Sequence, residues 1–121
     1  MVTATAWIIF FLGVIHCIAG VAMFKKPLAE AIQQGFVGKL RGSEGRLAFW
    51  FIIVGPLLMT IGQVAIYASV ESNLFLLKLI GYYLASTSII GVMAFPIARN
   101  GFWVLLVAAP ILIASGYGFI V

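Results

Sequence analysis

Residues 47–69 of the chain read LAFWFIIVGPLLMTIGQVAIYAS, a run without a charged side chain. About 20 such residues form a helix long enough to cross the ~30 Å hydrocarbon layer of a membrane. Three further apolar runs reach this length, at residues 4–24, 74–97 and 101–121, and the only charged residue among them is Lys78, near the start of the second. Each run is apolar on every face, unlike the alternating strands of a membrane barrel. We therefore predict one all-α domain, residues 1–121, built as an integral membrane four-helix bundle.

The composition of the whole chain agrees with this class. Hydrophobic residues make up 64% of the chain and charged residues only 8%, and the mean hydropathy is +1.23. Soluble domains are about one quarter charged, so these values exclude a cytosolic enzyme, a nucleic-acid-binding module and a disordered tail. The lone cysteine, Cys17, cannot form an internal disulfide. We expect a lipid bilayer as the surroundings and no nucleic-acid partner.

Basic side chains are unevenly distributed between the two sides of the predicted bundle. Five of them lie between the first and second spans and Arg99 precedes the fourth, whereas the opposite side carries only Lys78. Because basic connections stay on the cytoplasmic side, this bias predicts a multi-pass cell-membrane protein with both termini outside. The five residues between the first two spans are Lys25, Lys26, Lys39, Arg41 and Arg46.

Residues 27–40, between the first two spans, carry a helical pattern of their own. Pro27 can begin a helix, and an apolar residue then recurs every fourth position among polar ones. Such an amphipathic helix is expected to lie in the membrane interface. A plain connector and a lipid-sensing or partner-binding element both fit this pattern. The apolar positions are Leu28, Ile32, Phe36 and Leu40.

The two halves of the sequence also resemble each other. RLAFW at residues 46–50 corresponds to RNGFW at residues 99–103, and GVAMF at 20–24 corresponds to GVMAF at 91–95. A proline and, six residues later, a glycine follow each FW pair: Pro56 and Gly62, then Pro110 and Gly116. This pattern predicts two tandem helical hairpins related by a parallel internal repeat. Both prolines are expected to kink their helices at matching depths.

A polar layer near the middle of the membrane contains the candidate functional residues. His16 lies about 12 Å from the nearer end of its span, and its helical neighbours at i−3, i+1 and i+4 are small. We expect its ring to meet other polar side chains, or a carbonyl that Pro56 or Pro110 frees. The candidate ligand-binding residues are His16, Cys17, Gln63, Ser86, Thr87 and Ser88.

Three roles remain open for His16. It can form a hydrogen bond that joins two helices, it can bind a ligand or handle a proton, or it can ligate a metal or haem. No second histidine, paired cysteine or carboxylate lies within the spans to complete a metal site or a hydrolytic site. The sequence therefore predicts no metal, no cofactor and no catalytic residues.

Two further segments carry a resemblance to a known family. They are EGRLAFWF at residues 44–51, followed by GPLL at 55–58, and the spacing Gly13-x-x-His16-x-x-x-Gly20. With them the chain resembles, over nearly its whole length, a bacterial family of small four-helix membrane proteins of unknown function. Its hairpin layout is more loosely similar to small four-helix membrane proteins of the DoxX kind. The resemblance implies a bacterial inner membrane and supplies no activity.

Three functions are compatible with these features. The first is a non-catalytic bundle that binds a small apolar ligand, a lipid or a membrane partner. The second is a minimal transporter that works as a homo-oligomer, although small proton-coupled exporters use a membrane-embedded carboxylate that this chain lacks. The third is a membrane enzyme that uses His16 as an acid or base. The first function requires the fewest special residues.

Overall fold

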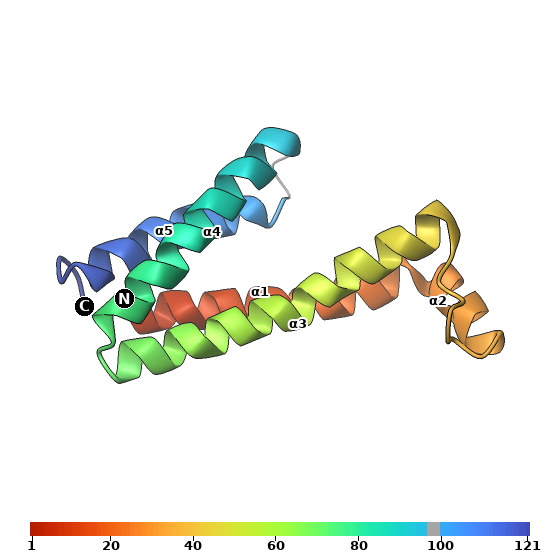
Figure 1. The fold of residues 1–121 in the computed structure, drawn as a ribbon, viewed down its shortest axis with the longest axis horizontal. Helices are drawn as coiled ribbons and strands as arrows, with labels where there is room; N and C mark the ends of the chain where they lie inside the picture. The colour runs from red at the N-terminus through yellow and green to blue at the C-terminus, as the bar shows by residue number, and fades with distance from the viewer. Residues whose placement is uncertain (97–99) are drawn as a thin grey trace. The chain divides into compact units, whose positions relative to one another are not determined.

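The computed structural model describes residues 1–96 and 100–121 of the chain and consists of helices, with no strand in these ranges (Figure 1). This result confirms the predicted all-α class. Ile97 and Arg99, which belong to the predicted third span and the predicted basic turn, lie outside the described residues. The helices are α1 (Val2–Met23), α2 (Lys25–Gln33), α3 (Gly42–Val70), α4 (Leu74–Ala94) and α5 (Phe102–Gly116).

Helices α1, α3 and α4 are long and apolar enough to cross a membrane. Helix α5 is equally apolar but has 15 residues, about 22 Å at 1.5 Å per residue. In the most apolar 18-residue stretch of each helix, only 22% is buried within the structure for α1, 22% for α3 and 28% for α4. Apolar surface therefore covers the outside of these helices, as a lipid environment requires.

The chain divides into two compact units, which are described separately. One unit contains residues 11–59, that is, most of α1, all of α2 and the first part of α3. The other contains residues 1–10 and 60–121, and so includes α4 and α5. Each unit is held together by antiparallel helices that lie side by side (Figure 1).

In the unit of residues 11–59, glycines allow the backbones of α1 and α3 to approach closely. A methyl group added at Gly55 would lie 2.9 Å from the carbonyl oxygen of Gly13 and 3.1 Å from the amide nitrogen of Cys17. Both distances are shorter than an ordinary contact, so a side chain at position 55 would push the helices apart. Small residues serve this purpose at helix contacts in membranes.

In the other unit, α4 and α5 pack against each other in the same way (Figure 1). A methyl group added at Gly116 would lie 2.8 Å from the amide nitrogen of Lys78 and 2.9 Å from the carbonyl oxygen of Leu74. The side chains of Leu77, Ser88 and Leu112 are fully buried. The contact at Gly116 therefore joins the end of α5 to the first turn of α4.

Helix α2 corrects the predicted segment 27–40, because it ends at Gln33. Gly35 adopts a φ of +96°, and the amide of Phe36 bonds to the carbonyl of Ala31 over 2.7 Å. The amide of Gly35 bonds to the carbonyl of Ile32 over 3.1 Å. These two bonds form a Schellman motif, which ends a helix at a glycine. Phe36 and Leu40 therefore do not continue the helical stripe that Leu28 and Ile32 begin.

Helix α5 ends in the same manner, five residues before the end of the predicted fourth span. Gly118 has a φ of +80°, the amide of Phe119 bonds to the carbonyl of Ala114 over 3.0 Å, and that of Gly118 bonds to Ser115. Because the left-handed conformation costs other residues about 1–2 kcal/mol, glycine is favoured at this position. Tyr117 is thereby placed directly after the last helical residue.

The two predicted kink residues, Pro56 and Pro110, lie inside α3 and α5 respectively. Each removes one N–H from its helix and leaves the carbonyl four residues earlier without that donor. The affected carbonyls belong to Ile52 and Leu106. That the two helices bend at matching depths stays a prediction.

Candidate functional site

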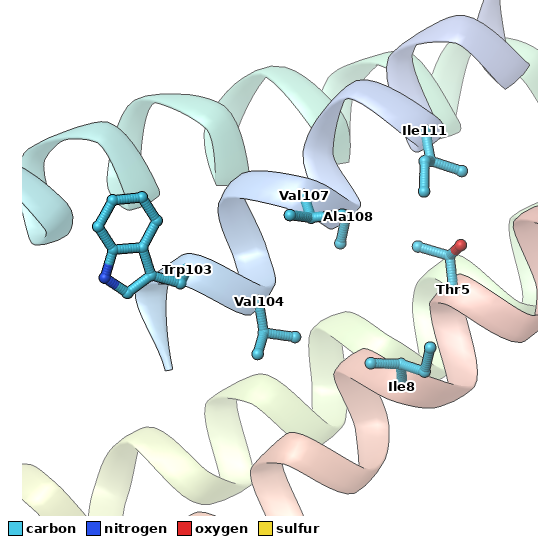
Figure 2. A pocket seen from close by; sticks show the side chains of 7 residues that line it. All are labelled: Thr5, Ile8, Trp103, Val104, Val107, Ala108 and Ile111. Atoms are coloured by element: carbon cyan, nitrogen blue, oxygen red, sulfur yellow. The ribbon is translucent and has the colours of Figure 1, made fainter. Parts of the chain in front are cut away.

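An apolar groove lies in the unit that contains α4 and α5 (Figure 2). The first turns of α1 form one wall and the first ten residues of α5, 102–111, form the other. Its volume is about 370 Å³, within the range of about 300–1,000 Å³ that ligand sites occupy. The lining residues are Thr5, Ile8, Trp103, Val104, Val107, Ala108 and Ile111.

The α5 wall is one face of that helix. Val104, Val107, Ala108 and Ile111 follow one another at i, i+3, i+4 and i+7, so their side chains share a stripe. Ala108 is the smallest of the four and is almost fully buried, at 3% exposed. Its short side chain leaves room between the larger neighbours, and Figure 2 shows Val104 and Ile111 on either side of it.

Thr5 has the one hydroxyl group among the lining residues. Its Oγ1 donates a hydrogen bond to the carbonyl oxygen of Met1 over 3.0 Å. Because this proton is used within α1, the hydroxyl does not require a polar partner from a molecule in the groove. No lining residue is charged. The groove is therefore suited to hydrocarbon rather than to a polar ligand.

His16, the central candidate from the sequence, lies in the unit of residues 11–59. Its Nδ1 lies 3.3 Å from the carbonyl oxygen of Phe51, and its ring centroid lies 4.5 Å from that of Phe51. The acceptor residue, Phe51, directly precedes Ile52 in the chain. Ile52 is the residue whose carbonyl loses its helical donor because of Pro56. His16 is half-buried and contacts α3 rather than leaving its ring free on α1.

Cys17 is a free, half-buried cysteine beside Gly55 of α3. It also lines a shallow depression, together with Ile18, Val21, Ala22 and Lys25. These other residues come from α1 and the first residue of α2. The depression has no opposing wall, so it does not enclose a ligand.

The serines of α4 are satisfied within their own helix. Ser86 Oγ donates to the carbonyl of Tyr82 and Ser88 Oγ to that of Ala85, each over 3.1 Å. Ser88 is fully buried, whereas Ser86 and Thr87 are exposed. Gln63 is also exposed, on α3. None of these four residues lines the groove, and their assignment to a ligand stays a prediction.

The predicted interfacial residues differ in exposure. Ile32 is 66% exposed and Phe36 is 51% exposed, while Leu28 and Leu40 are half-buried. Within residues 1–96 and 100–121, no three histidine, cysteine or carboxylate side chains come together as a metal site would require. The groove itself was not predicted, since every face of α5 is apolar and the stripe from Val104 to Ile111 does not differ from its surroundings.

These features define an all-α protein in which three helices, α1, α3 and α4, have the length and composition of membrane spans. Comparison with protein families gives the particular assignment: the chain belongs to a family of unknown function (DUF6463), whose family model matches residues 2–117. This match confirms the expected resemblance to a family of unknown function. No curated protein and no solved structure matches the chain.

Proposed function

We propose that this chain is a non-catalytic integral membrane protein that binds an apolar chain, the hydrocarbon tail of a lipid-like molecule, in the groove between α1 and α5. The groove carries this proposal, since its walls are apolar and its one hydroxyl is already bonded to Met1. Lipid tails are as apolar as the walls of the groove, so burial from water does not drive this binding. The fit of the tail against the walls, through many dispersion contacts, is what would favour the groove over the bilayer.

The exposed residues around the groove favour a ligand that enters from the bilayer. Ile8 is 53% exposed, Val107 is 66% exposed and Trp103 is 40% exposed. An apolar ligand can reach such a groove laterally from lipid, without crossing water. Tryptophan at the end of a membrane helix is typical of the interface, so Trp103 marks the depth at which the groove begins.

The membrane arrangement belongs to the same proposal. We place the protein in a bacterial inner membrane as a four-helix bundle with both termini outside, with α2 in the interface. The uneven distribution of basic residues supports this orientation. The exposed side chain of Ile32 and the exposed Lys25 and Lys26 support contact of α2 with lipid headgroups.

The internal repeat is also part of the proposal. Its support is that Pro56 and Pro110 both lie inside helices. The glycine six residues after each proline lies at a close helix contact: Gly62 meets Phe10, and Gly116 meets Lys78. A duplicated hairpin would preserve both features. A DoxX-like layout would follow from the same duplication.

We further propose that the protein forms homo-oligomers. The exposed amide of Gln63, within the apolar part of α3, supports this. A polar side chain on a lipid-facing surface gains a hydrogen bond when a second helix covers it.

Mass spectrometry of co-purified lipids tests the groove. The protein is purified in a mild detergent, and its bound lipids are compared with the lipids of the source membrane. Val104→Phe adds a ring to the groove, and Val64→Phe is the matched control, because Val104 and Val64 are both 38% exposed and only Val104 lines the groove. We expect an apolar molecule to be enriched with the wild type and with Val64→Phe, and to be lost with Val104→Phe. Equal lipid content in all three proteins would refute the proposal.

A further inference from the structure

Lys78, Tyr82 and Tyr117 form a cluster at one end of the pair α4 and α5. The hydroxyl oxygens of Tyr82 and Tyr117 lie 2.7 Å apart and share a hydrogen bond. The Nζ of Lys78 lies 4.8 Å from the centre of the Tyr117 ring, a distance at which a cation is attracted to an aromatic face. We refer to these three residues as the Lys78 cluster.

Backbone geometry holds the cluster together. Lys78 and Tyr82 are separated by one helical turn and share a face of α4. The close contact of Gly116 with the backbone of Leu74 and Lys78 brings the end of α5 against this turn. Gly118 then ends α5, which fixes the position of Tyr117. The three side chains are therefore positioned by two helices and not by a flexible segment.

The Lys78 cluster has more hydrogen-bond donors than acceptors to receive them. Of its two phenolic protons, one is used in the bond between Tyr82 and Tyr117, so the other remains available. The ammonium group of Lys78 has three N–H donors. No carboxylate forms an ion pair with Lys78 among the described residues, and the nearest one along the chain, Glu71, lies in the preceding turn. An anionic group with several acceptor oxygens would complement this arrangement.

The depth of the cluster indicates which anion it meets. Lys78 lies four residues after the first residue of α4, about 6 Å along the helix axis, and Tyr117 directly follows the last residue of α5. Both positions are at the ends of apolar helices, where tyrosine and lysine face the headgroup region. Tyr82 is 49% exposed and Tyr117 is 51% exposed. The cluster is therefore accessible at the level of phosphates.

We infer that the Lys78 cluster binds a phosphate group, with the Lys78 ammonium pairing with its charge and a tyrosine hydroxyl donating to one of its oxygens. Phospholipid headgroups and free phosphate share this chemistry. The site is separate from the groove, since none of its residues lines the groove. It holds whether or not the groove binds hydrocarbon.

Native mass spectrometry of the full chain tests the inference. The purified protein is titrated in detergent with phosphatidylglycerol, and in parallel with a diacylglycerol that has the same tails and no phosphate. In a third arm, inorganic phosphate is added and the thermal unfolding midpoint is measured, because a ligand of the folded state raises it. The variants are Lys78→Met, which keeps an apolar stem and removes the charge, and the double variant Tyr82→Phe with Tyr117→Phe. Tyr83→Phe is the matched control, an exposed tyrosine outside the cluster.

We expect the wild type and Tyr83→Phe to retain phosphatidylglycerol in preference to diacylglycerol. Loss of a charge-assisted hydrogen bond should weaken retention about tenfold or more in Lys78→Met, and several-fold in the double variant. If inorganic phosphate raises the unfolding midpoint of the wild type but not that of Lys78→Met, the result supports the site and shows that it also binds free phosphate. If Lys78→Met retains phosphatidylglycerol like the wild type, or if diacylglycerol is retained equally well, the inference is wrong. Each variant's midpoint without ligand shows that it is folded.

Discussion

The Nδ1 atom of His16 lies 3.3 Å from the carbonyl oxygen of Phe51, so the one histidine of the chain joins α1 to α3. A carbonyl only accepts hydrogen bonds, so Nδ1 is the donor in this bond. The two rings also lie close together, with centroids 4.5 Å apart. This geometry supports a role for His16 in holding the two helices together, which is the first of the three roles expected from the sequence.

The first prediction tests this role with two substitutions at position 16. Leucine cannot donate to the Phe51 carbonyl, so His16→Leu should lower the free energy of unfolding by about 1 kcal/mol. Glutamine has an amide N–H that can replace the imidazole donor, and His16→Gln should retain most of this stability. Thermal unfolding in detergent measures both. If His16→Gln is as stable as the wild type yet loses its bound lipid, the ring binds ligand instead.

The second prediction concerns the close contact of α1 and α3 at Gly55. Valine at this position would meet the Gly13 carbonyl oxygen and the Cys17 amide, which belong to the backbone and cannot rotate away. Overpacking of this kind costs about 1–3 kcal/mol, so Gly55→Val should lower the unfolding midpoint. Leu57→Phe is the control, because it adds volume at a side chain that is 57% exposed. If Gly55→Val and Leu57→Phe unfold at the same midpoint, the extra side chain at position 55 is accommodated between α1 and α3 without loss of stability.

The third prediction concerns the end of α2 at Gly35. No atom lies within 4 Å of a methyl group built at this position, but the φ of +96° disfavours a side chain. Gly35→Ala should therefore weaken the motif by about 1 kcal/mol through the backbone alone, whereas Gly35→Asn should weaken it less, since asparagine tolerates left-handed conformations. Hydrogen exchange at the Phe36 amide, which bonds to Ala31, measures the difference. Equal protection in both variants would argue against the motif.

The fourth prediction concerns orientation. In a Cys17→Ala background, a cysteine introduced by Lys39→Cys should react with an impermeant maleimide only in inverted membrane vesicles, since basic connections stay in the cytoplasm. Glu71→Cys, in the exposed turn between α3 and α4, should react only in intact cells. The two sites serve as controls for each other. The reverse pattern would invert the proposed topology.

The sequence was sufficient to predict the all-α class and three of the apolar helices, because long uninterrupted apolar runs are visible directly in the hydropathy along the chain. It was not sufficient for the helix ends. The stripe of Leu28, Ile32, Phe36 and Leu40 continues through Gly35, yet two backbone hydrogen bonds stop the helix there. Gly118 stops α5 in the same way. Glycine at these positions indicates the end of a helix, and the spacing of apolar residues alone does not take it into account.

The candidate site shows a second limit of sequence reasoning. Rare polar residues such as His16 and Ser88 stand out in an apolar chain, but the structure satisfies them with nearby carbonyls. The groove is made of Val104, Ala108 and their neighbours, which look like the rest of α5. Its location depends on where α1 crosses α5, and that contact between distant segments is not encoded in local periodicity.

The last prediction concerns Gln63 and the proposed homo-oligomer. Gln63 lies seven residues before Val70, the last residue of α3, about 10 Å along the axis, and its side chain is exposed on an apolar helix. An amide that faces hydrocarbon lacks partners, and the same amide of a second copy can supply both a donor and an acceptor across a two-fold axis. Because such a bond contributes about 1–2 kcal/mol in model peptides, Gln63→Leu should raise the dissociation constant of the dimer roughly tenfold. Energy transfer between labelled copies, measured in liposomes over a range of lipid dilutions, gives this constant.

Leu57→Ala is the control, since it changes an exposed apolar residue of the same helix and removes no polar group. If Gln63→Leu associates as strongly as the wild type, Gln63 does not hold two copies together; if the wild type shows no energy transfer at any dilution, the protein is a monomer.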